Sequence, residues 1–250
     1  MNSSIPKSHP RYVSLLTREK IALGLKKGFV HETGLIAHGR GEAFDYLLGE
    51  TTIPVVNEAE RIAAAALVTA CHPVISVNGN VVALAAEECI RLSHEIPAPL
   101  EVNLFHRTTE RVKRLVTYLK NQGAQNVLGL EADAVIAGLD HDRARCDHAG
   151  IFSADVVLVP LEDGDRCQAL VDMGKTVIAV DLNPFSRTAQ TASITIVDNL
   201  LRAMPSLLQY VQEFKAKPHD ELYLLVDSWN NRDMLKQVYT YLSKRLNSLS

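Results

Sequence analysis

Short apolar runs alternate with longer amphipathic stretches along residues 73–215. Most of the short runs are rich in valine, isoleucine or leucine and end at polar residues or glycine, as buried β-strands do. The runs that predict strands are 73–79, 100–105, 126–130, 154–161, 175–183 and 193–197. The stretches that predict helices are 80–96, 108–123, 163–174 and 198–214. This alternation predicts an α/β fold, in which a mostly parallel sheet carries helices on both faces.

Both ends of the chain are predicted to be helical. Residues 12–28, 41–49 and 57–71 show helical patterns at the N-terminal end, and residues 220–246 form a largely helical tail. Pro205 is expected to kink or break the helix over 198–214. We therefore expect one domain over residues 1–250, made of a helical N-terminal part (1–72), an α/β core (73–215) and a helical tail (216–250).

The composition narrows the class of protein. Apolar residues make up 47% of the 250 residues and charged residues 22%, as in ordinary globular proteins with a sizeable core. The net charge of −3 and the pI of about 6.3 argue against a broad nucleic-acid-binding surface. No apolar run reaches the roughly 18 residues of a membrane span, and the start, MNSSIPKSHPRY, lacks the apolar segment of a signal peptide. We expect a cytoplasmic protein that binds no membrane.

The cysteines and histidines do not predict a metal site. Cys71, Cys89, Cys146 and Cys167 are widely spaced and form no CxxC pair, so we expect reduced structural cysteines. His141, Cys146 and His148 could be drawn as a metal cluster, but their spacing matches no zinc template. We expect a solvated loop there and no metal bound by protein ligands alone.

Two segments resemble phosphate-binding loops without matching one. Gly174-Lys175-Thr176 looks like the end of a Walker A motif, but it precedes a strand and position 169 is alanine. In the stretch GLIAHGRGEAF (34–44), Gly39 and Gly41 give G-x-G, but Phe44 stands where a dinucleotide fingerprint has its third glycine. Gly174 is better explained as the end of a helix.

The second stretch still suggests anion binding. His38, Arg40 and Glu42 cluster around its two glycines. Arg40 would lie at the N-terminus of a helix starting at Gly41, where free N–H groups favour phosphate and a guanidinium can bind it with two hydrogen bonds. The alternative, a helix–helix turn with an exposed arginine, is equally compatible with these residues.

Polar side chains follow several predicted strands. Asn78 and Asn80 come after one strand, His106 and Arg107 after the next, and Asp181, Asn183, Ser186 and Arg187 after a third. In an open parallel sheet, ligands bind at the carboxyl ends of the strands, so the recurrence favours a binding cleft over isolated turns. Glu162, Asp163 and Asp165 follow a fourth strand. They could bind Mg²⁺ beside phosphates or cap the next helix.

Long motifs in a fixed order give these loops a context. They are IPKSHPRY, TREKI, GLIAHGRGEAFDYLLGE, PVISVNGN, VNLFHRT, ADVVLVPLEDGDR, VIAVDLNPFSRTA and ITIVDN. Together they resemble the archaeal 4-phosphopantoate–β-alanine ligases, also called archaeal phosphopantothenate synthetases, over nearly the whole chain. The resemblance implies a Rossmann-like α/β fold, a homodimer, and the joining of 4-phosphopantoate to β-alanine in coenzyme A biosynthesis. It implies that ATP is converted to AMP and pyrophosphate, through an acyl-adenylate and with Mg²⁺.

The resemblance also implies positions for the ligands. The ATP contacts that carry over are Arg18, Arg40, Asp181, Leu182, Asn183, Arg187, Thr188, Asn199 and Leu200. For the acid, our own hypothesis from the loops gives the 4-phosphate to Arg107, the carboxylate or hydroxyl to Asn78 and Asn80, and the proton of the amine to His106. The alternative is that His106 and Arg107 only cap the following helix.

Two other functions remain open from the residues alone. One is a non-catalytic regulator that binds a nucleotide on the same fold. The other is a related ligase with a different acid or amine, which fold alone does not exclude.

Overall fold

The computed structural model describes residues 5–9 and 11–248, so Pro10 of the first motif and the ends of the chain lie outside the described residues. A sheet of six parallel strands forms its centre, in the order β3-β2-β1-β6-β7-β8. Its strands are β1 (Pro73–Val77), β2 (Leu100–Val102), β3 (Val127–Leu128), β6 (Val156–Pro160), β7 (Thr176–Val180) and β8 (Ile194–Ile196). Each lies inside a predicted segment, and the sheet confirms the predicted fold class.

The strand order reverses between β1 and β6. From β1 the chain winds outward through β2 to β3, and then returns to place β6 on the other side of β1. This is the order of the Rossmann fold, in which the loops after the two central strands diverge and leave a crevice for a ligand. The register pairs Ile75 of β1 with Leu100 of β2 and with Leu158 of β6, which brings the loops after these strands to one edge.

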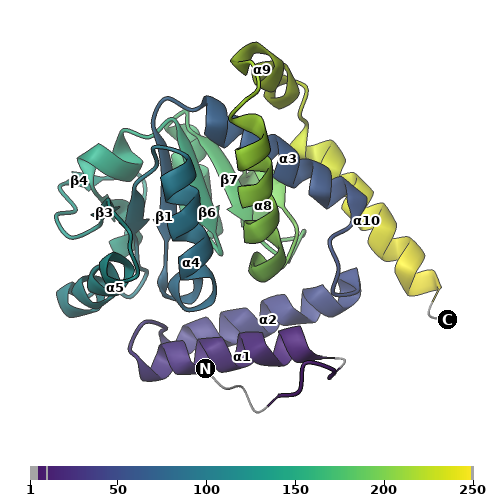
Figure 1. The fold of residues 1–250 in the computed structure, drawn as a ribbon, viewed down its shortest axis with the longest axis horizontal. Helices are drawn as coiled ribbons and strands as arrows, with labels where there is room; N and C mark the ends of the chain where they lie inside the picture. Colours follow the sequence, from purple (N-terminus) through teal and green to yellow (C-terminus); the bar gives the residue numbers. More distant parts are fainter. Residues whose placement is uncertain (1–4, 10, 249–250) are drawn as a thin grey trace.

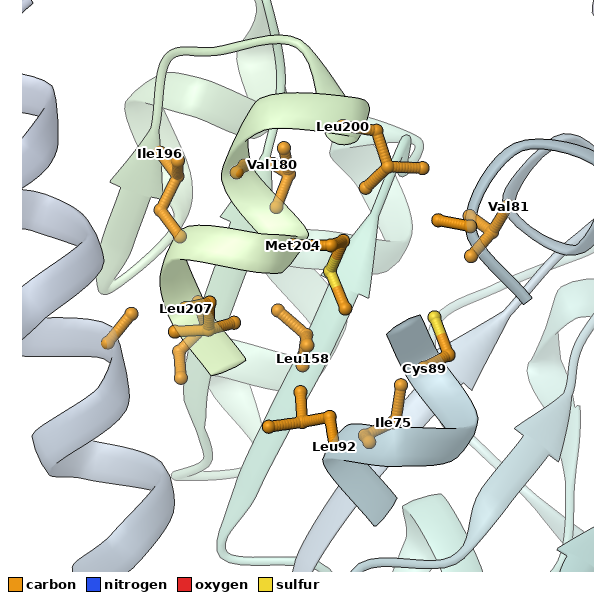
Figure 2. Close-up of a cluster of buried hydrophobic side chains, with 14 of the residues drawn as sticks. Ile75, Val81, Cys89, Leu92, Leu158, Val180, Ile196, Leu200, Met204 and Leu207 are labelled. Carbon is orange, nitrogen blue, oxygen red and sulfur yellow. The ribbon is translucent and has the colours of Figure 1, made fainter. Parts of the chain in front are cut away.

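Alternate residues of the strands serve two hydrophobic cores. Ile75, Leu158, Val180 and Ile196 face α4 (Gly79–Glu95) and α8 (Leu200–Phe214), where Met204 and Leu207 meet them (Figure 2). On the opposite face, Val157 and Val177 join a second cluster with α6 (Gly164–Asp172). Helices therefore cover both faces, and strands buried on both sides need the nearly continuous apolar runs seen in the sequence.

The remaining helices surround these layers. They are α1 (Tyr12–Lys26), α2 (Glu32–Leu48), α3 (Pro54–Thr69), α5 (Thr109–Asn121), α7 (Arg187–Thr191), α9 (His219–Asp227) and α10 (Asn231–Asn247). Thr108 caps α5, because its side chain accepts a hydrogen bond from the N–H of Arg111. The expectation that Pro205 breaks its helix is wrong: α8 is one helix from Leu200 to Phe214. As the sixth residue of α8, Pro205 removes the backbone hydrogen bond to the carbonyl of Leu201, and the buried face of α8 holds the helix together despite this loss.

Helix α2 starts earlier than the sequence predicted. It begins at Glu32, so the GLIAHGRGEAF stretch lies within the helix and not in a turn. Figure 1 shows α1 and α2 side by side across one end of the sheet. Gly34 lets α2 approach the start of α4 closely, because a Cβ at position 34 would lie 2.4 Å from the side-chain oxygen of Asn80. The close contact puts one face of α2 against the loops that follow the strands.

A small subdomain between β3 and β6 was not predicted. Strands β4 (Ala134–Val135) and β5 (Arg145–Cys146) pair antiparallel, with the short helices η1 (Asp142–Ala144) and η2 (His148–Phe152) beside them. Buried Glu101 of β2 holds the segment by accepting hydrogen bonds from the N–H groups of Asp147 (3.0 Å) and Ile151 (2.7 Å). The hydrogen bonds fix this segment beside the edge where the β2 loop emerges.

Glu60 gives a prediction about stability. Its side chain is buried between α3 and α8, Oε2 accepts a hydrogen bond from Ser206 (2.6 Å), and Oε1 has no partner among the described residues. Burial raises the pKa of Glu60 to about 7. The folded protein therefore holds this proton more tightly than the unfolded chain, and stability falls as the pH rises from about 4.5 to about 7.

We expect Glu60→Gln to stabilise the protein by about 1–3 kcal/mol at pH 8 and by much less at pH 5, because the amide needs no proton to stay neutral. Urea denaturation at the two pH values measures the difference. Glu58→Gln is the control on the same helix, since Glu58 is about half exposed beside Arg61. A gain that does not depend on pH would contradict the prediction.

Candidate functional site

A first cavity of about 400 Å³ opens at the carboxyl ends of β6, β7 and β8. One helix, α2, closes it from the side with His38 and Arg40. Eight of the nine side chains predicted to contact ATP line this cavity: Arg40, Asp181, Leu182, Asn183, Arg187, Thr188, Asn199 and Leu200. Residues from three separate segments of the chain, namely α2, the loop after β7 and the start of α8, thus meet where the sheet topology places a ligand.

Asp181 organises the loop after β7. Its carboxylate accepts hydrogen bonds from the N–H of Asn183 (2.9 Å) and the hydroxyl of Ser186 (2.5 Å). The Ser186 oxygen in turn caps α7 by accepting from the N–H of Ala189 (2.9 Å). Burial raises the pKa of Asp181. The carboxylate therefore shapes the loop that carries Asn183 and Arg187 into the cavity.

The other lining side chains are also held in place. Thr188 donates from its hydroxyl to the carbonyl of Glu162 (2.8 Å), which joins the loops after β6 and β7. Asn199 caps α8 and donates to buried Asp45 of α2 (2.9 Å). His38 differs from these, because its Nε2 is buried and has no hydrogen-bond partner among the described residues. Burial lowers the pKa of His38, so the ring is neutral at pH 7.

A second cavity of about 570 Å³ lies at the ends of β1 and β2. It is lined by Asn78 and Asn80, predicted to hold the acid, and by His106, predicted to take the proton of the amine. It adjoins the first cavity, because both are lined by Ala37, Arg40, Asn80, Leu161 and Asp163. The two predicted ligand sites are therefore contiguous, and the Arg40 side chain stands at their boundary.

The two asparagines of the second cavity also have structural partners. Asn78 follows β1 and donates from Nδ2 to the carbonyl of Leu161 (2.9 Å), after β6. Its Oδ1 accepts from the N–H groups of Asn80 (3.0 Å) and Val81 (3.1 Å) and so caps α4. Asn80 donates to the carbonyl of Gly34 in α2 (2.9 Å). Asn78 therefore ties the two strands together at the point where the strand order reverses.

Arg40 lies in the cleft for a different reason than the sequence suggested. The expectation that it stands at a helix N-terminus, among free N–H groups, is wrong because α2 begins at Glu32. The backbone N–H groups around Arg40 are already hydrogen-bonded within the helix, so they are not free to bind an anion. What places Arg40 is the position of α2 across the edge of the sheet, and its side chain is exposed to both cavities.

The loop after β6 contains buried ion pairs. The Glu162 side chain is 1% exposed and pairs with Arg143 (2.8 Å) and with Arg166. Asp163 pairs with Arg143 as well (2.6 Å), and Asp165 contacts His141 (3.0 Å). Glu162 and Asp163 are thus paired with arginines, and no group of three or more His, Cys, Asp or Glu side chains in the described part of the chain could hold a metal ion.

Comparison with known proteins shows the family of the chain. The sequence model of the phosphopantothenate/pantothenate synthetase family matches residues 55–245. The chain belongs to this family. A protein named 4-phosphopantoate–β-alanine ligase from Methanosarcina mazei is 50% identical over 248 residues, which cover 99% of this chain and 98% of the relative. A protein of the same name from Thermococcus kodakarensis is 51% identical over 248 residues, which cover 99% of this chain and 95% of the relative.

The family model begins after α2, whereas the alignments with the two relatives extend over nearly the whole chain. The predicted contacts Arg18 and Arg40 therefore stand outside the family model. Arg18 does not line either cavity: its guanidinium pairs with Glu42 (2.9 Å) between α1 and α2.

Within the residues that the structure describes, no helix is long and apolar enough to cross a bilayer.

Arg107, like Arg18, is a predicted residue that the structure places outside both cavities. It donates to the carbonyl of Gly129 (2.6 Å) and does not line the second cavity. The hypothesis that Arg107 binds the phosphate therefore lacks geometric support. Two arginines that sequence reasoning missed, Arg111 and Arg143, line the cavity instead. The residue spacing along the predicted helix of α5 could have pointed to Arg111. No sequence pattern pointed to Arg143, which lies in the segment with the short strands β4 and β5.

The Asp181 loop gives a prediction for this site. We expect Asp181→Ala to raise the KM for ATP by about 10-fold or more, with a much smaller effect on the KM for β-alanine. The lost carboxylate would leave the Asn183 N–H and the Ser186 hydroxyl without their acceptor and loosen the loop that lines the first cavity. Steady-state kinetics with each substrate varied in turn measures this. Equal effects on every substrate would show general collapse and contradict the assignment.

Proposed function

We propose that this protein joins 4-phosphopantoate to β-alanine, forming 4′-phosphopantothenate on the route to coenzyme A. ATP is the energy source and is converted to AMP and pyrophosphate. Two relatives about 50% identical over nearly the whole chain are named for the same ligase. The observation that carries the proposal is that two cavities share one wall, with Arg40 at their boundary.

The chemistry requires such an arrangement. A carboxylate is a poor acyl donor and must be activated before an amine can attack it. With AMP as the product, the carboxylate attacks the α-phosphate of ATP and displaces pyrophosphate, and the amine of β-alanine then attacks the acyl carbon of the acyl-adenylate and releases AMP. ATP in the first cavity and the acid in the second would bring the α-phosphate and the carboxylate together near Arg40. A guanidinium at that point stabilises the charge that develops on phosphorus and on the leaving pyrophosphate. A regulator that binds only a nucleotide has no need of the second cavity.

Mg²⁺ would enter with ATP. In nucleotide sites this ion is held largely by the phosphates and by one or two carboxylates. The described residues fit that role better than a cage of protein ligands, because Glu162 is buried against two arginines while Asp163 keeps a side chain that is 45% exposed in the cleft. Asp163 is therefore the carboxylate that would reach the ion.

A homodimer, which the resemblance implies, is also part of the proposal. Light scattering of the purified protein measures its oligomeric state.

The test is an assay of purified protein with ATP, 4-phosphopantoate and β-alanine. We expect AMP and pyrophosphate to form only when all three are present. Exchange of labelled pyrophosphate into ATP, with the acid present and β-alanine absent, would report the acyl-adenylate. ADP as the product, or turnover that does not depend on β-alanine, would overturn the proposal.

A further inference from the structure

Four side chains that can carry positive charge line the second cavity and not the first: Arg111, Arg143, His31 and His106. Arg111, from α5, donates from Nε and Nη2 to the carbonyl of Phe29 (3.1 and 2.7 Å) and from Nη1 to the carbonyl of His106 (2.9 Å). No carboxylate of the described residues forms an ion pair with it, and burial lowers the pKa of Arg111. Its partly buried charge is therefore held only by backbone oxygens.

The two histidines form a stacked pair beside it. Their ring centroids are 3.8 Å apart, and the Thr33 hydroxyl lies 2.9 Å from Nδ1 of His31 and 3.4 Å from Nε2 of His106. Burial lowers the pKa of His31, and the charges of His106 and Arg111 lower it further. The charge of Glu32 partly opposes these effects on His31. Arg111 itself has no ion-paired carboxylate among the described residues, and a bound anion would supply its counter-charge.

The other arginines nearby are different. Arg143 also lines the second cavity but is neutralised by Glu162 and Asp163. Arg114, one turn further along α5, pairs with Glu110 (2.8 Å). Arg107 does not line the cavity. Among the arginines of the second cavity, Arg111 is therefore the one that neither pairs with an acid nor stands at the boundary with the first cavity.

Gly79 brings the cluster together. A Cβ at Gly79 would lie 2.0 Å from the carbonyl oxygen of Phe29 and 2.8 Å from Nη2 of Arg111. The backbone at the start of α4 can thus approach the Phe29 loop and the guanidinium only without a side chain. This contact fixes Arg111 at the wall of the cavity.

We propose that Arg111, with His31 and His106, binds the 4-phosphate of the acid substrate and selects the phosphorylated acid over the unphosphorylated one. This rests on the proposed function. The carboxylate end of the acid must meet ATP at Arg40, so the phosphate end lies against cations that do not border the ATP cavity. A phosphate monoester carries a charge of about −1.5 to −2 at pH 7 and accepts several hydrogen bonds. The assignment replaces Arg107 and gives His106 a binding role in place of proton transfer.

Calorimetric titration with 4-phosphopantoate and with pantoate, without ATP or β-alanine, tests the assignment. We expect the wild type to bind the phosphorylated acid more tightly, and Arg111→Ala to reduce that preference about 10- to 100-fold while pantoate binding changes little. Arg111→Lys is the second variant, because it keeps the charge and a donor for the Phe29 carbonyl. It should still lose much of the preference, since the two-pronged contact is lost. Arg114→Ala is the matched control and should keep the full preference.

Three results would overturn the assignment: no preference in the wild type, equal weakening of both acids in the Arg111 variants, or loss of preference in Arg107→Ala alone. Binding is measured without turnover, so the outcome is separate from that of the ligase assay. A retained preference without AMP formation would contradict the proposed function and leave this site standing.

Discussion

Replacing Arg40 by alanine is expected to lower kcat about 100- to 1000-fold while the protein stays folded. The side chain is exposed, makes no hydrogen bond or ion pair with another described residue, and lines both cavities. Removing it therefore costs the fold little. Among the described residues that line both cavities Arg40 is the one cation, so the change removes the positive charge at the place where the charge of the reacting phosphate would develop.

AMP formation in steady state, with circular dichroism as the check on folding, measures this effect. Arg40→Lys should recover part of the activity, because it restores the charge without the two-pronged donor geometry. Arg61→Ala is the control, since Arg61 pairs with Glu58 on α3 away from both cavities. Near-normal turnover in folded Arg40→Ala would show that the Arg40 side chain does not contribute to catalysis.

The Glu162→Ala variant should lose about 3–5 kcal/mol of unfolding free energy. Its carboxylate neutralises Arg143 and Arg166, whose side chains are 5% and 0% exposed. Without Glu162, Arg166 would be a buried guanidinium with no ion-pair partner among the described residues, and Arg143 would keep only Asp163. A buried charge left without its partner costs far more than the pair itself gained.

Denaturant titration of the wild type and the variant gives the size of this loss. Glu110→Ala is the matched control, because Glu110 and Arg114 have the same i, i+4 spacing on an exposed surface. We expect it to cost at most about 1 kcal/mol. Similar losses in the two variants would contradict the prediction, because they would show that the buried Glu162 ion pairs stabilise the protein no more than an exposed pair does.

The strands could be predicted because burial on both faces leaves a direct mark on the sequence. VVLVP in β6 and TVIAV in β7 are almost entirely apolar, and few other structures need such runs. The carboxyl-end rule then placed Asp181, Asn183 and Asn78 at one edge of the sheet. The order of the strands was not derivable from this pattern, and the structure shows it.

Helix α2 shows where local pattern failed. Gly34, Gly39 and Gly41 lower helix propensity, and the sequence therefore predicted a helix that starts only at Gly41. Gly34 is needed for contact with Asn80, but a Cβ at Gly39 would meet nothing within 4 Å, and the structure shows no steric reason for glycine there. Contacts distant in sequence, such as the bond from Asn80 to the Gly34 carbonyl, fix the helix.

The choice between Arg107 and Arg111 was out of reach for a related reason. Both follow the β2 strand within a few residues, and a sequence does not state which side chain turns toward a cavity. The direction depends on partners from remote segments: Gly129 draws Arg107 away, and the Phe29 carbonyl holds Arg111 in. Neither partner is near in sequence.

The position of α2 across the edge of the sheet has a thermodynamic consequence. One rigid helix forms a wall of both cavities, so a ligand that displaces it on one side also reshapes the other side. The free energies of binding in the two cavities would then not be additive. Linkage makes any such coupling reciprocal: the factor by which nucleotide tightens or loosens the acid is the factor by which the acid changes the affinity for nucleotide.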